Sequence, residues 1–507
     1  GVLRKAFVKV WPGNADKCKD QVGDHRQVTG RNAPTTVNAA FNLYQFWDGR
    51  ANRFFNGVNP FGSLDPDAKI WVNDGSGLSK ERILIDFSSL ASQCVGPPNN
   101  ATEMACGPVN GSRTWVDLAR KLLSNKTVPL GLQEVHPDDG VLGPYHSSTG
   151  GINPSYAELV RDAFQDRYWK SDEATPGGAT LMEANFAFIF GLAVQAYERT
   201  LLSDDSKFDR FARGEVDLTD QEKEGFSRFL SGGTRCNSCH DGPLFSTATF
   251  EFGLVFPIEA MDLENAEGPG LYDTGFYNVG VSPTDFDLGR GRKDLPFGDL
   301  LSLSKQSNAG TRAFSPNLPL VPASEGQAQV DGHMKMPSLR NIELTAPYFH
   351  NGKFATLEAT VEFYARGGDL PGNRHLDPDI RRIGQLDGKP DKIAAVAAWM
   401  RTLTDDRVRF RRAPFDHPSI LIPNGHKTKN GRVVDNLELM EATGKNGAAT
   451  AFPDFLTRLG GGTTAPPADT ELADGMEAEE AGAEEAEEAE AEEAEAEEAE
   501  AEEAGAE

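Results

Sequence analysis

The stretch CNSCH at residues 236–240 constrains this chain more than any other feature of its sequence. Two thiols three positions apart, followed at once by a histidine, form the attachment motif of c-type haem. Each thiol makes a thioether to one haem vinyl group, and the imidazole ligates the iron. A zinc site would need two further Cys or His ligands at suitable spacing, and Cys18, Cys94 and Cys106 form no second pair. A thioredoxin-like pair needs no following histidine and would lie near a βαβ pattern, so the motif predicts covalent haem c.

The length and the charge distribution separate a folded body from an acidic tail. At 507 residues there is enough chain for two or three domains. From Asp469 onward there are 20 acidic residues and no Lys or Arg, which accounts for most of the formal charge of −27. Neighbouring Glu side chains repel one another, and no apolar face is left to bury. Residues 466–507 are therefore predicted to be a disordered or transiently helical tail, with an electrostatic lure for a basic partner as the functional alternative.

Nothing in the sequence points to nucleic acid or to a membrane. The chain has no basic patch of the kind that binds nucleic acid, and no run approaches 18 uninterrupted apolar residues. The amino terminus GVLRKAFVKVWPG lacks the apolar core of a secretory signal. Because c-type haem is normally attached outside the bacterial cytoplasm, we expect a periplasmic or otherwise extracytoplasmic protein whose signal lay upstream of Gly1. Whether Cys94 and Cys106 form a disulfide there is left open by the sequence.

Helical periodicity recurs in four stretches, and most of the remaining chain is rich in loops. The four stretches are residues 155–169, 181–202, 219–230 and 391–403. The second has too many apolar side chains for one face and is expected to be buried on most sides. Thr219 and Glu222 fit a capping box at the start of the third. Residues 1–150 and 245–328 are Gly- and Pro-rich, which favours a mainly α fold with long loops over a doubly wound sheet.

Four separated stretches resemble the bacterial di-haem cytochrome c peroxidases and their relatives. They are GRNAPTTVNAAFNLYQFWDGRAN from residue 30, ASQCVGPPNNATEM from residue 91, FYNVGVSP and DLGRGR between residues 276 and 292, and MKMPSLRNIELTAPYFHNG from residue 334. The motifs occur in the order typical of that family, and the similarity extends from about residue 20 to about residue 420.

The resemblance implies two cytochrome c-like haem domains with long irregular loops. Residues 1–205 would form the amino-terminal, peroxidatic domain, and residues 206–408 the carboxy-terminal domain that holds CNSCH. Residues 409–465 would return across the first domain. In this family the carboxy-terminal haem transfers electrons and the amino-terminal haem binds and splits hydrogen peroxide.

The carboxy-terminal haem is expected to be held by residues that match the family's motif. Its covalent and proximal contacts would be Cys236, Cys239 and His240. The second axial ligand comes from just before PSLRN, where Met334 is preferred by position and the alternatives are Met336 and His333. A thioether ligand raises the haem potential relative to a second histidine, which suits an acceptor of electrons. His350 is expected to be structural or to contact a haem propionate rather than to ligate iron.

The resemblance also implies the residues of the peroxide site. Gln93 and Glu103 match a polar pair over the peroxidatic iron. A carboxylate in an apolar pocket can move a proton from the near peroxide oxygen to the leaving one, while an amide orients the peroxide. Trp47 matches a tryptophan between the haems, where an indole shortens the electron path; the alternative is a buried aromatic anchor. Asn32 matches a ligand of a calcium ion between the domains; the alternative is an ordinary turn residue.

The sequence departs from the family in one respect. No second haem motif precedes GRNAP, and Cys18 has no partner three residues away. We expect the motif of the second haem to lie upstream of Gly1, with genuine loss of that haem as the competing explanation.

The function implied by the resemblance is that of a di-haem peroxidase. A small donor protein, a cytochrome c or a cupredoxin, would reduce the carboxy-terminal haem, and hydrogen peroxide would be reduced to water. The first alternative is a mono-haem electron-transfer protein that has lost the peroxidatic haem. The second is a related di-haem oxidase that acts on a protein-bound tryptophan; it would be favoured by a tyrosine ligand, and residues 333–336 contain no tyrosine. The donor and the oligomeric state, with a homodimer among the alternatives, stay open.

Overall fold

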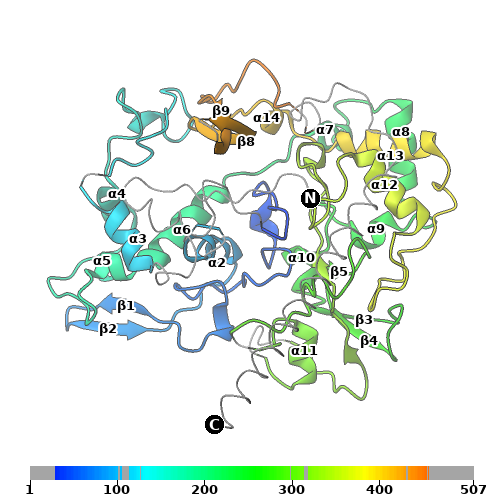
Figure 1. The fold of residues 1–507 in the computed structure, drawn as a ribbon, viewed down its shortest axis with the longest axis horizontal. Coiled ribbons are helices and arrows are strands. Elements are labelled where there is room, and N and C mark those ends of the chain that lie inside the picture. Colours follow the sequence, from blue (N-terminus) through cyan, green and yellow to red (C-terminus); the bar gives the residue numbers. More distant parts are fainter. Residues whose placement is uncertain are drawn as a thin grey trace, which may run out of the picture. The chain divides into compact units, whose positions relative to one another are not determined.

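The structure of the chain is a computed structural model (Figure 1). It describes residues 29–100, 103–104, 114–125, 127–296, 298–312, 318–429, 432–453 and 455. The chain divides into two compact units, Gly1–Phe455 and Leu456–Glu507, and the described residues belong to the first. Cys18, Cys106 and the acidic tail predicted over residues 466–507 lie outside the described residues.

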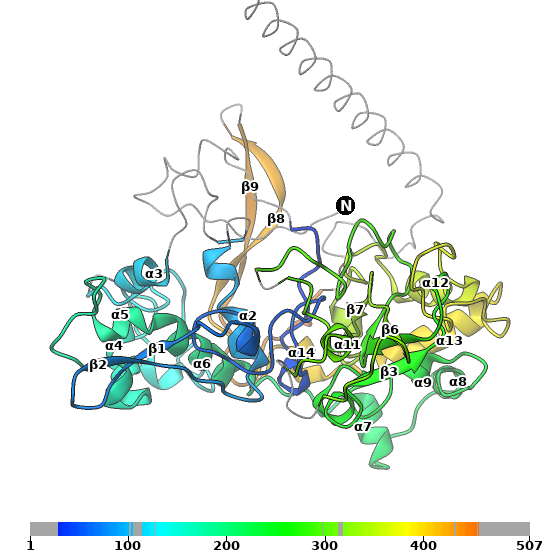
Figure 2. The same ribbon diagram turned by 90° about the horizontal axis from the view of Figure 1, so that it is seen from below.

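Helices dominate the described residues, as the sequence predicts. The first region, residues 29–205, contains α2 (Ser89–Cys94), α3 (Trp115–Leu122), α4 (Tyr156–Ala163), α5 (Leu181–Ala184), α6 (Phe186–Glu198) and the antiparallel strands β1 (Ile70–Asn73) and β2 (Leu78–Glu81). The second region, residues 206–408, contains α7 (Lys207–Ala212), α8 (Asp220–Phe229), α9 (Cys236–Cys239), α10 (Phe250–Gly253), α11 (Leu303–Asn308), α12 (Leu357–Arg366) and α13 (Pro390–Arg401); α14 (Asp406–Arg409) begins in it. The 3-10 helices are η1 (Ala39–Phe41), η2 (Gly62–Leu64), η3 (Pro97–Asn99), η4 (Gly143–Tyr145), η5 (Asp166–Tyr168) and η6 (Ile342–Leu344). Figures 1 and 2 show α2 to α6 gathered on one side and α7 to α13 on the other.

The stretch 245–328, which lacks periodicity, contains short strands in addition to loops. Three of them, β3 (Ile258–Met261), β4 (Gly270–Asp273) and β6 (Gln327–Ala328), form a three-stranded sheet. The fourth, β5 (Phe276–Tyr277), pairs with β7 (Met334–Lys335), which lies just beyond the stretch. Strands of two to four residues are too short to produce a readable alternation, so the sequence pattern misses them.

The predicted helix over residues 181–202 is two helices. They are separated at Asn185, whose amide accepts a hydrogen bond from the Trp71 N–H (2.9 Å) and donates to the Trp71 carbonyl (2.7 Å). A side-chain amide that bonds the backbone of a strand in this way competes with the helical hydrogen bonds. The expected burial on most sides is found in the first turn of α6, residues 186–189, whereas Ala193 is exposed.

The second region is built around the crossing of α8 and α13. Thr219 and Glu222 form the predicted capping box at the start of α8. Gly225 lies at the crossing because a Cβ there would meet the Ala395 carbonyl. Trp399, on α13, is fully buried and packs against several phenylalanines. One of them is Phe229, whose ring centroid lies 4.3 Å from that of Trp399.

Two loops, residues 31–51 and residues 334–354, share one backbone design although their sequences differ. We call them the first loop and the second loop. In each, an asparagine in the left-handed region precedes a 3-10 helix: Asn38 (φ 59°) precedes η1 and Asn341 (φ 58°) precedes η6. The two loops therefore begin alike in the two regions of the chain.

The loops also turn in the same way further along. Each turns at a phenylalanine with φ 64°, Phe46 in the first loop and Phe349 in the second. In both turns a 3.2 Å hydrogen bond joins the phenylalanine carbonyl to the N–H three residues on. The residue after each phenylalanine is aromatic, Trp47 or His350.

The two loops bind one another reciprocally. The Asn32 N–H of the first loop donates to the His350 carbonyl (2.5 Å), and the Lys335 N–H of the second donates to the Trp47 carbonyl (2.6 Å). The Trp47 and His350 rings meet edge to face, with centroids 6.2 Å apart and planes at 65°. Because each loop makes the equivalent contact to the other, the two loops are related by an approximate two-fold axis.

Each loop is anchored to the segment that follows a long helix. The Asn38 side chain exchanges two hydrogen bonds with Ser203, which follows α6. The Asn341 side chain accepts a 2.9 Å hydrogen bond from the Asp405 N–H, which follows α13. The repeated unit is therefore a loop together with the end of a helix.

Residues beyond α14 contact the first region. Strands β8 (Ile420–Lys429) and β9 (Arg432–Met440) form an antiparallel hairpin. Just before β8, the Ser419 N–H donates a hydrogen bond to the Glu134 carbonyl (2.8 Å). The Asp416 carboxylate accepts a hydrogen bond from the Gly140 N–H (2.6 Å). The return of residues 409–465 across the first domain and the division into domains at residues 205, 408 and 465 stay predictions.

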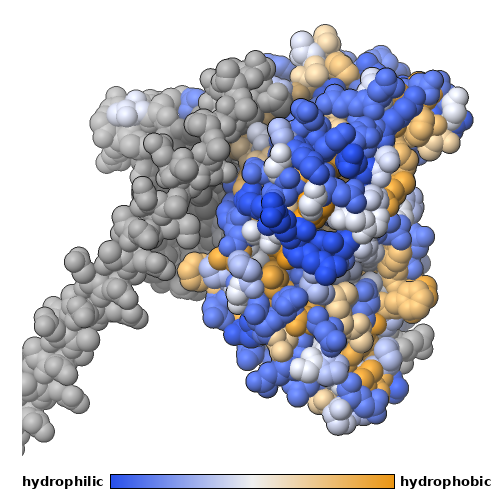
Figure 3. All heavy atoms as spheres, turned by 90° about the vertical axis from the view of Figure 1, so that its right-hand side faces the viewer, coloured by the Kyte–Doolittle hydropathy of each residue, from blue (hydrophilic) through white to orange (hydrophobic). Residues whose placement is uncertain are grey.

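No helix within the described residues has the length and apolar character needed to cross a membrane. The surface in Figure 3 is largely hydrophilic, with hydrophobic groups scattered over it.

Candidate functional site

The CNSCH motif forms the short helix α9 between the α8–α13 core and the strands. The thiols of Cys236 and Cys239 are free and half-buried. Cys236 packs against the cluster that surrounds Trp399, and Cys239 against a cluster that includes Met336. Burial raises the pKa of both thiols.

His240 has the tautomer that a metal ligand needs. Its Nδ1 lies 2.9 Å from the Phe245 carbonyl, and a carbonyl can only accept, so Nδ1 carries the proton. Burial lowers the pKa of His240 to about 4, so the ring is neutral and Nε2 keeps its lone pair. A histidine whose other nitrogen donates to a backbone carbonyl is the usual arrangement in metal sites. The sequence pattern identifies His240 but not Phe245, which fixes the tautomer.

The three candidates for the second axial ligand are all buried, but their surroundings differ. Both ring nitrogens of His333 face backbone carbonyls, at 3.0 Å and 3.2 Å. Met336 shares a core cluster with Cys239. Met334 borders a cavity of about 10 Å³, room for one water, which His350 also lines. These contacts favour a methionine over His333 and leave the preference for Met334 a prediction.

Trp47 lies at the approximate two-fold axis. Its indole N–H donates to the Asn32 carbonyl (2.6 Å), and its ring contacts His350. His350 in turn lies 3.2 Å from the Ser282 hydroxyl through Nε2. His350 therefore takes part in two features. It lines the cavity beside Met334 in the second region, and its ring contacts Trp47 of the first region.

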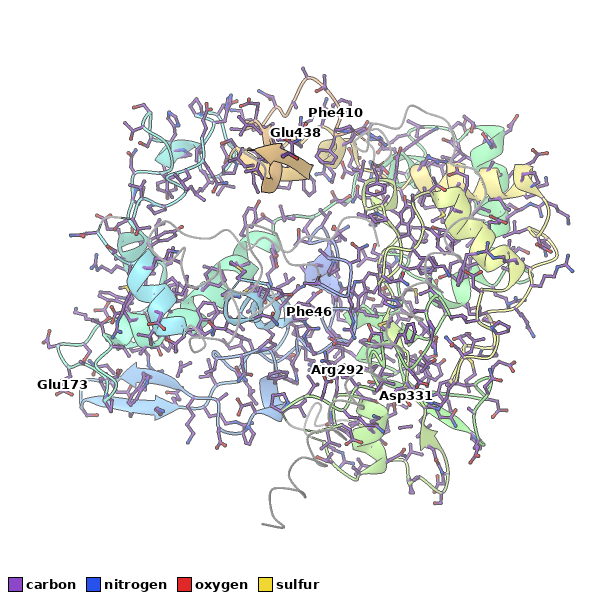
Figure 4. All side chains as sticks on the ribbon, viewed as in Figure 1. Phe46, Glu173, Arg292, Asp331, Phe410 and Glu438 are labelled. Atoms are coloured by element: carbon purple, nitrogen blue, oxygen red, sulfur yellow. The ribbon has the colours of Figure 1, made fainter. Side chains whose placement is uncertain are left out.

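Gln93 and Glu103 are both half-buried, Gln93 on α2 and Glu103 after η3. Burial raises the pKa of Glu103, and the positive charge of Arg50 opposes this rise. Arg50, near the end of the first loop, also lies over the Phe46 ring, 3.8 Å from its centroid. Phe46 lies between the two groups of helices in Figure 4. Over the part of the chain that the structure describes, no hydrogen bond joins the side chains of Gln93 and Glu103.

Asn32 is surrounded by carbonyl oxygens. Its amide nitrogen donates to the carbonyls of Pro347 (2.7 Å) and Phe349 (3.3 Å). Within the described ranges, no group of three or more His, Cys, Asp or Glu side chains could hold a metal ion. A calcium ion here would depend on backbone and amide oxygens and stays a prediction.

Asp48, next to Trp47, is a residue that the sequence analysis does not single out. Its fully buried carboxylate contacts Arg31 (2.7 Å), Arg50 (3.1 Å) and Arg292 (2.8 Å). These three charges hold the pKa of Asp48 well below its usual range, although burial alone would raise it. Arg292 comes from the second region, and Figure 4 shows it near Phe46. The only sequence signal is that the charges lie in the motifs GRNAP, WDGR and GRGR.

Haem c fits the residues that the structure brings together around α9. Two free thiols, a neutral imidazole with an available Nε2 and two buried thioethers are the donor set that this cofactor uses.

Comparison with known proteins finds similarity to di-haem cytochrome c peroxidases and to related proteins. Residues 9–217 match the sequence model described as di-haem cytochrome c peroxidase. The chain is 25% identical to cytochrome c peroxidase Ccp of Escherichia coli over 380 residues, which are 74% of this chain and 52% of that protein. It is 24% identical over 401 residues to cytochrome c551 peroxidase of Nitrosomonas europaea, covering 79% of this chain and 73% of the relative. It is also 28% identical over 217 residues to methylamine utilization protein MauG of Methylorubrum extorquens, covering 43% and 41%.

Proposed function

The chain is related to the di-haem cytochrome c peroxidases, and from this premise we propose that it is a haem c oxidoreductase that reduces hydrogen peroxide to water. Its electrons would come from a small donor protein, a cytochrome c or a cupredoxin, outside the cytoplasm. The reaction consumes two electrons and two protons for each peroxide, breaks the O–O bond and yields two waters. Calcium and a homodimer are further parts of the proposal that the family suggests.

Electrons enter at the second region. Cys236 and Cys239 would hold haem c covalently, and when bound this group supplies one-electron redox chemistry. His240 would ligate the iron through Nε2, because the Phe245 carbonyl holds its other nitrogen. Met334 or Met336 would supply the thioether that completes the set, and their burial would help to exclude water. The phenylalanines around Trp399 keep this site apolar.

Trp47 and His350 support transfer between the regions. Their rings are in contact at the axis, and the main-chain hydrogen bonds between the two loops hold them there. The buried Asp48 with its three arginines adds a second connection that keeps the loops together. These contacts position an aromatic relay between the electron entry site and the first region.

Glu103 and Gln93 would handle the peroxide in the first region. The observation that carries the proposal is the half-buried carboxyl of Glu103, whose pKa is raised by burial while Arg50 stays near it. Such a carboxyl can take a proton from the near peroxide oxygen and return it to the leaving oxygen. The amide of Gln93 would orient the peroxide for that transfer.

A donor oxidation assay tests this proposal on protein purified from its source. With reduced cytochrome c as donor, we expect two electrons to be withdrawn for every peroxide consumed. Oxidation of the donor without loss of peroxide would instead identify a mono-haem electron carrier. Oxidation of a protein-bound tryptophan with peroxide would favour the activity class of the related di-haem oxidases.

A further inference from the structure

Helices α6 and α13 occupy equivalent places in the two repeated units. The Asn38 N–H of the first loop donates a hydrogen bond to the Leu201 carbonyl, just after α6, at 3.0 Å. The Asn341 N–H of the second loop donates one to the Leu403 carbonyl, just after α13, at the same distance. Each asparagine side chain also accepts a hydrogen bond from the N–H two residues beyond that leucine, at 2.9 Å in both loops. The two helices can therefore be aligned residue by residue from Leu201 and Leu403.

In the second region, α8 covers one face of α13. A Cβ at Gly225 of α8 would meet the Ala395 carbonyl and would lie 2.9 Å from the Cβ of Trp399. The rings of Phe226 and Phe229, also on α8, lie with their centroids 5.6 Å and 4.3 Å from that of Trp399. Ala395 is 2% exposed and Trp399 is completely buried as a result.

The equivalent face of α6 has no such cover among the described residues. In the alignment, Ala193 corresponds to Ala395 and Tyr197 to Trp399. Ala193 is exposed, and Tyr197 is 49% exposed. Ala196, beside them on the same face, is exposed as well. The same positions are therefore buried in one repeated unit and open in the other.

The opening is confined to the second half of α6. In the first half, the rings of Phe186 and Phe190 pack against Trp115 of α3, with centroids 6.4 Å and 5.4 Å apart. Helix α3 closes that part and leaves the part that carries Ala193 and Tyr197 open. This is the part of the helix that α8 crosses in the second region.

We propose that the open face of α6 binds an amphipathic helix equivalent to α8, which leads into the attachment motif of the first haem. Helix α8 ends at Phe229 and CNSCH begins at Cys236, so the helix that covers α13 also delivers the cysteines of its own region. The covering helix of the first region would do the same for the motif that we expect upstream of Gly1. The proposal rests on the proposed function, which requires that first haem.

The open face also defines the chemistry of the helix that it binds. Two helices cross closely only where small residues meet, so a glycine or alanine should lie against Ala193, as Gly225 lies against α13. Apolar side chains should follow on the next turn and bury the ring of Tyr197. An exposed helix face of alanines and an aromatic ring is the pattern of a face that packs against another helix.

Photochemical cross-linking from position 197 identifies the bound segment directly. The protein is produced in its native host from the complete gene with Tyr197→p-benzoylphenylalanine, which keeps an aromatic ring and reacts with side chains in contact with it. Mass spectrometry should find the cross-link on a peptide of the same polypeptide that precedes a second CxxCH motif. The same change at Tyr145, which is 44% exposed, is the control and should not link to that peptide. A link to residues 1–28 or to a second copy, or no link at all, would overturn the proposal.

Thiol labelling provides a second readout. In the same protein, Ala193→Cys should react with a maleimide at least about tenfold more slowly than Glu173→Cys, which is at an exposed position, and about as slowly as Ala395→Cys. Peptide mass spectrometry separates these thiols from the native ones. Equal rates for Ala193→Cys and Glu173→Cys would overturn the proposal. Ala196→Cys replaces Ala193→Cys if the latter variant does not take up haem.

Neither measurement involves peroxide, so the two proposals can fail separately. A protein in which this helix covers α6 but which consumes no peroxide would contradict the proposed function and leave the docking of the helix standing. A protein that consumes peroxide while Ala193→Cys is labelled freely would contradict the docking alone.

Discussion

The first and second loops have one backbone and different chemistry. Both start from an asparagine at positive φ, both turn at a phenylalanine with φ 64°, and each donates a main-chain hydrogen bond to the other. At the axis, however, the first loop contributes Trp47 and the second contributes His350. The comparison teaches that the repeated part of the structure is the backbone scaffold and that the side chains on it differ. Under the proposed function, these side chains would divide the work between electron entry and peroxide chemistry.

The largest expected effect is on the second region. His240→Gly removes the imidazole whose Nε2 is available for iron, so we expect the spectrum of that ligated haem to be lost. His146→Gly is a matched control, because the Nδ1 of His146 also bonds a carbonyl, that of Val135, at 2.7 Å. Absorption spectra of the reduced proteins measure the effect. A spectrum that His240→Gly leaves unaltered contradicts the assignment of electron entry to this region.

The next effect concerns the first region. Glu103→Gln keeps the size of the side chain but cannot move a proton, so peroxide turnover should fall by at least about a hundredfold. Reduction of the haem at CNSCH by the donor should be unchanged. Glu173→Gln, at an exposed position of the same region, is the control. If Glu103→Gln turned over peroxide at the unaltered rate, the division of work between the regions would be wrong.

A smaller effect is expected at the axis between the loops. Trp47→Phe should slow oxidation of the second-region haem by peroxide about tenfold, equivalent to about 1.4 kcal/mol in the barrier. The substitution also removes the N–H bond to the Asn32 carbonyl. Trp169→Phe is the matched control, because its indole N–H bonds the Phe164 carbonyl at 2.9 Å, away from the axis. Stopped-flow spectroscopy compares them, and equal slowing in both variants would mean that Trp47 is only an aromatic anchor.

The helix packing of the two regions can be compared through one glycine in each. A Cβ at Gly225 would meet the Ala395 carbonyl of the crossing helix, and a Cβ at Gly191 would lie 2.6 Å from the Phe55 ring. We expect each change to alanine to destabilise the protein by roughly 1–3 kcal/mol, with Gly225→Ala the more severe because a backbone atom cannot move aside. Gly232→Ala, with no atom within 4 Å, should be nearly neutral. Urea unfolding measures the differences, and a neutral Gly225→Ala would contradict the close crossing.

The smallest effect is expected at the ends of the two long helices. Helix α6 ends on Glu198, whereas α13 ends on Arg401, and a helix carboxyl end favours the cation. Burial raises the pKa of Glu198 to about 7. The folded protein therefore holds this proton more tightly than the unfolded chain, and stability is lost as the pH rises from about 4.5 through 7.

This difference gives a pH-dependent prediction. Glu198→Gln should raise the Tm at pH 8 by on the order of 1–3 °C and leave it unchanged near pH 4, where the glutamate is protonated. Arg401→Gln should lower the Tm slightly at both values. Differential scanning calorimetry at the two pH values makes the comparison, and a gain for Glu198→Gln at pH 4 that equals the gain at pH 8 would contradict the shifted pKa.

Local sequence patterns were sufficient to predict the elements that depend only on residues close together in the chain. The capping box of Thr219 and Glu222 located the start of α8. CNSCH predicted a haem site, but it did not predict the short helix α9 that the motif forms. The break at Asn185 could not be predicted, because it depends on Trp71, which is far away in the chain. The repeat of the two loops was also missed, although Pro34, Asn38, Phe46 and Gly49 recur with the same spacing at Pro337, Asn341, Phe349 and Gly352. Four identities spread over sixteen residues are a weak signal without the matching backbone angles. Phe245 acquires its importance only from its hydrogen bond with His240 in the folded chain.

The count of covalent haem per polypeptide, by pyridine haemochrome against protein mass on material from the native source, tests the central claim most directly. The account predicts two haems, one held by Cys236 and Cys239 and one in the region of Gln93 and Glu103. A single haem per polypeptide would contradict it and identify an electron carrier that keeps the two-loop scaffold without the peroxide centre.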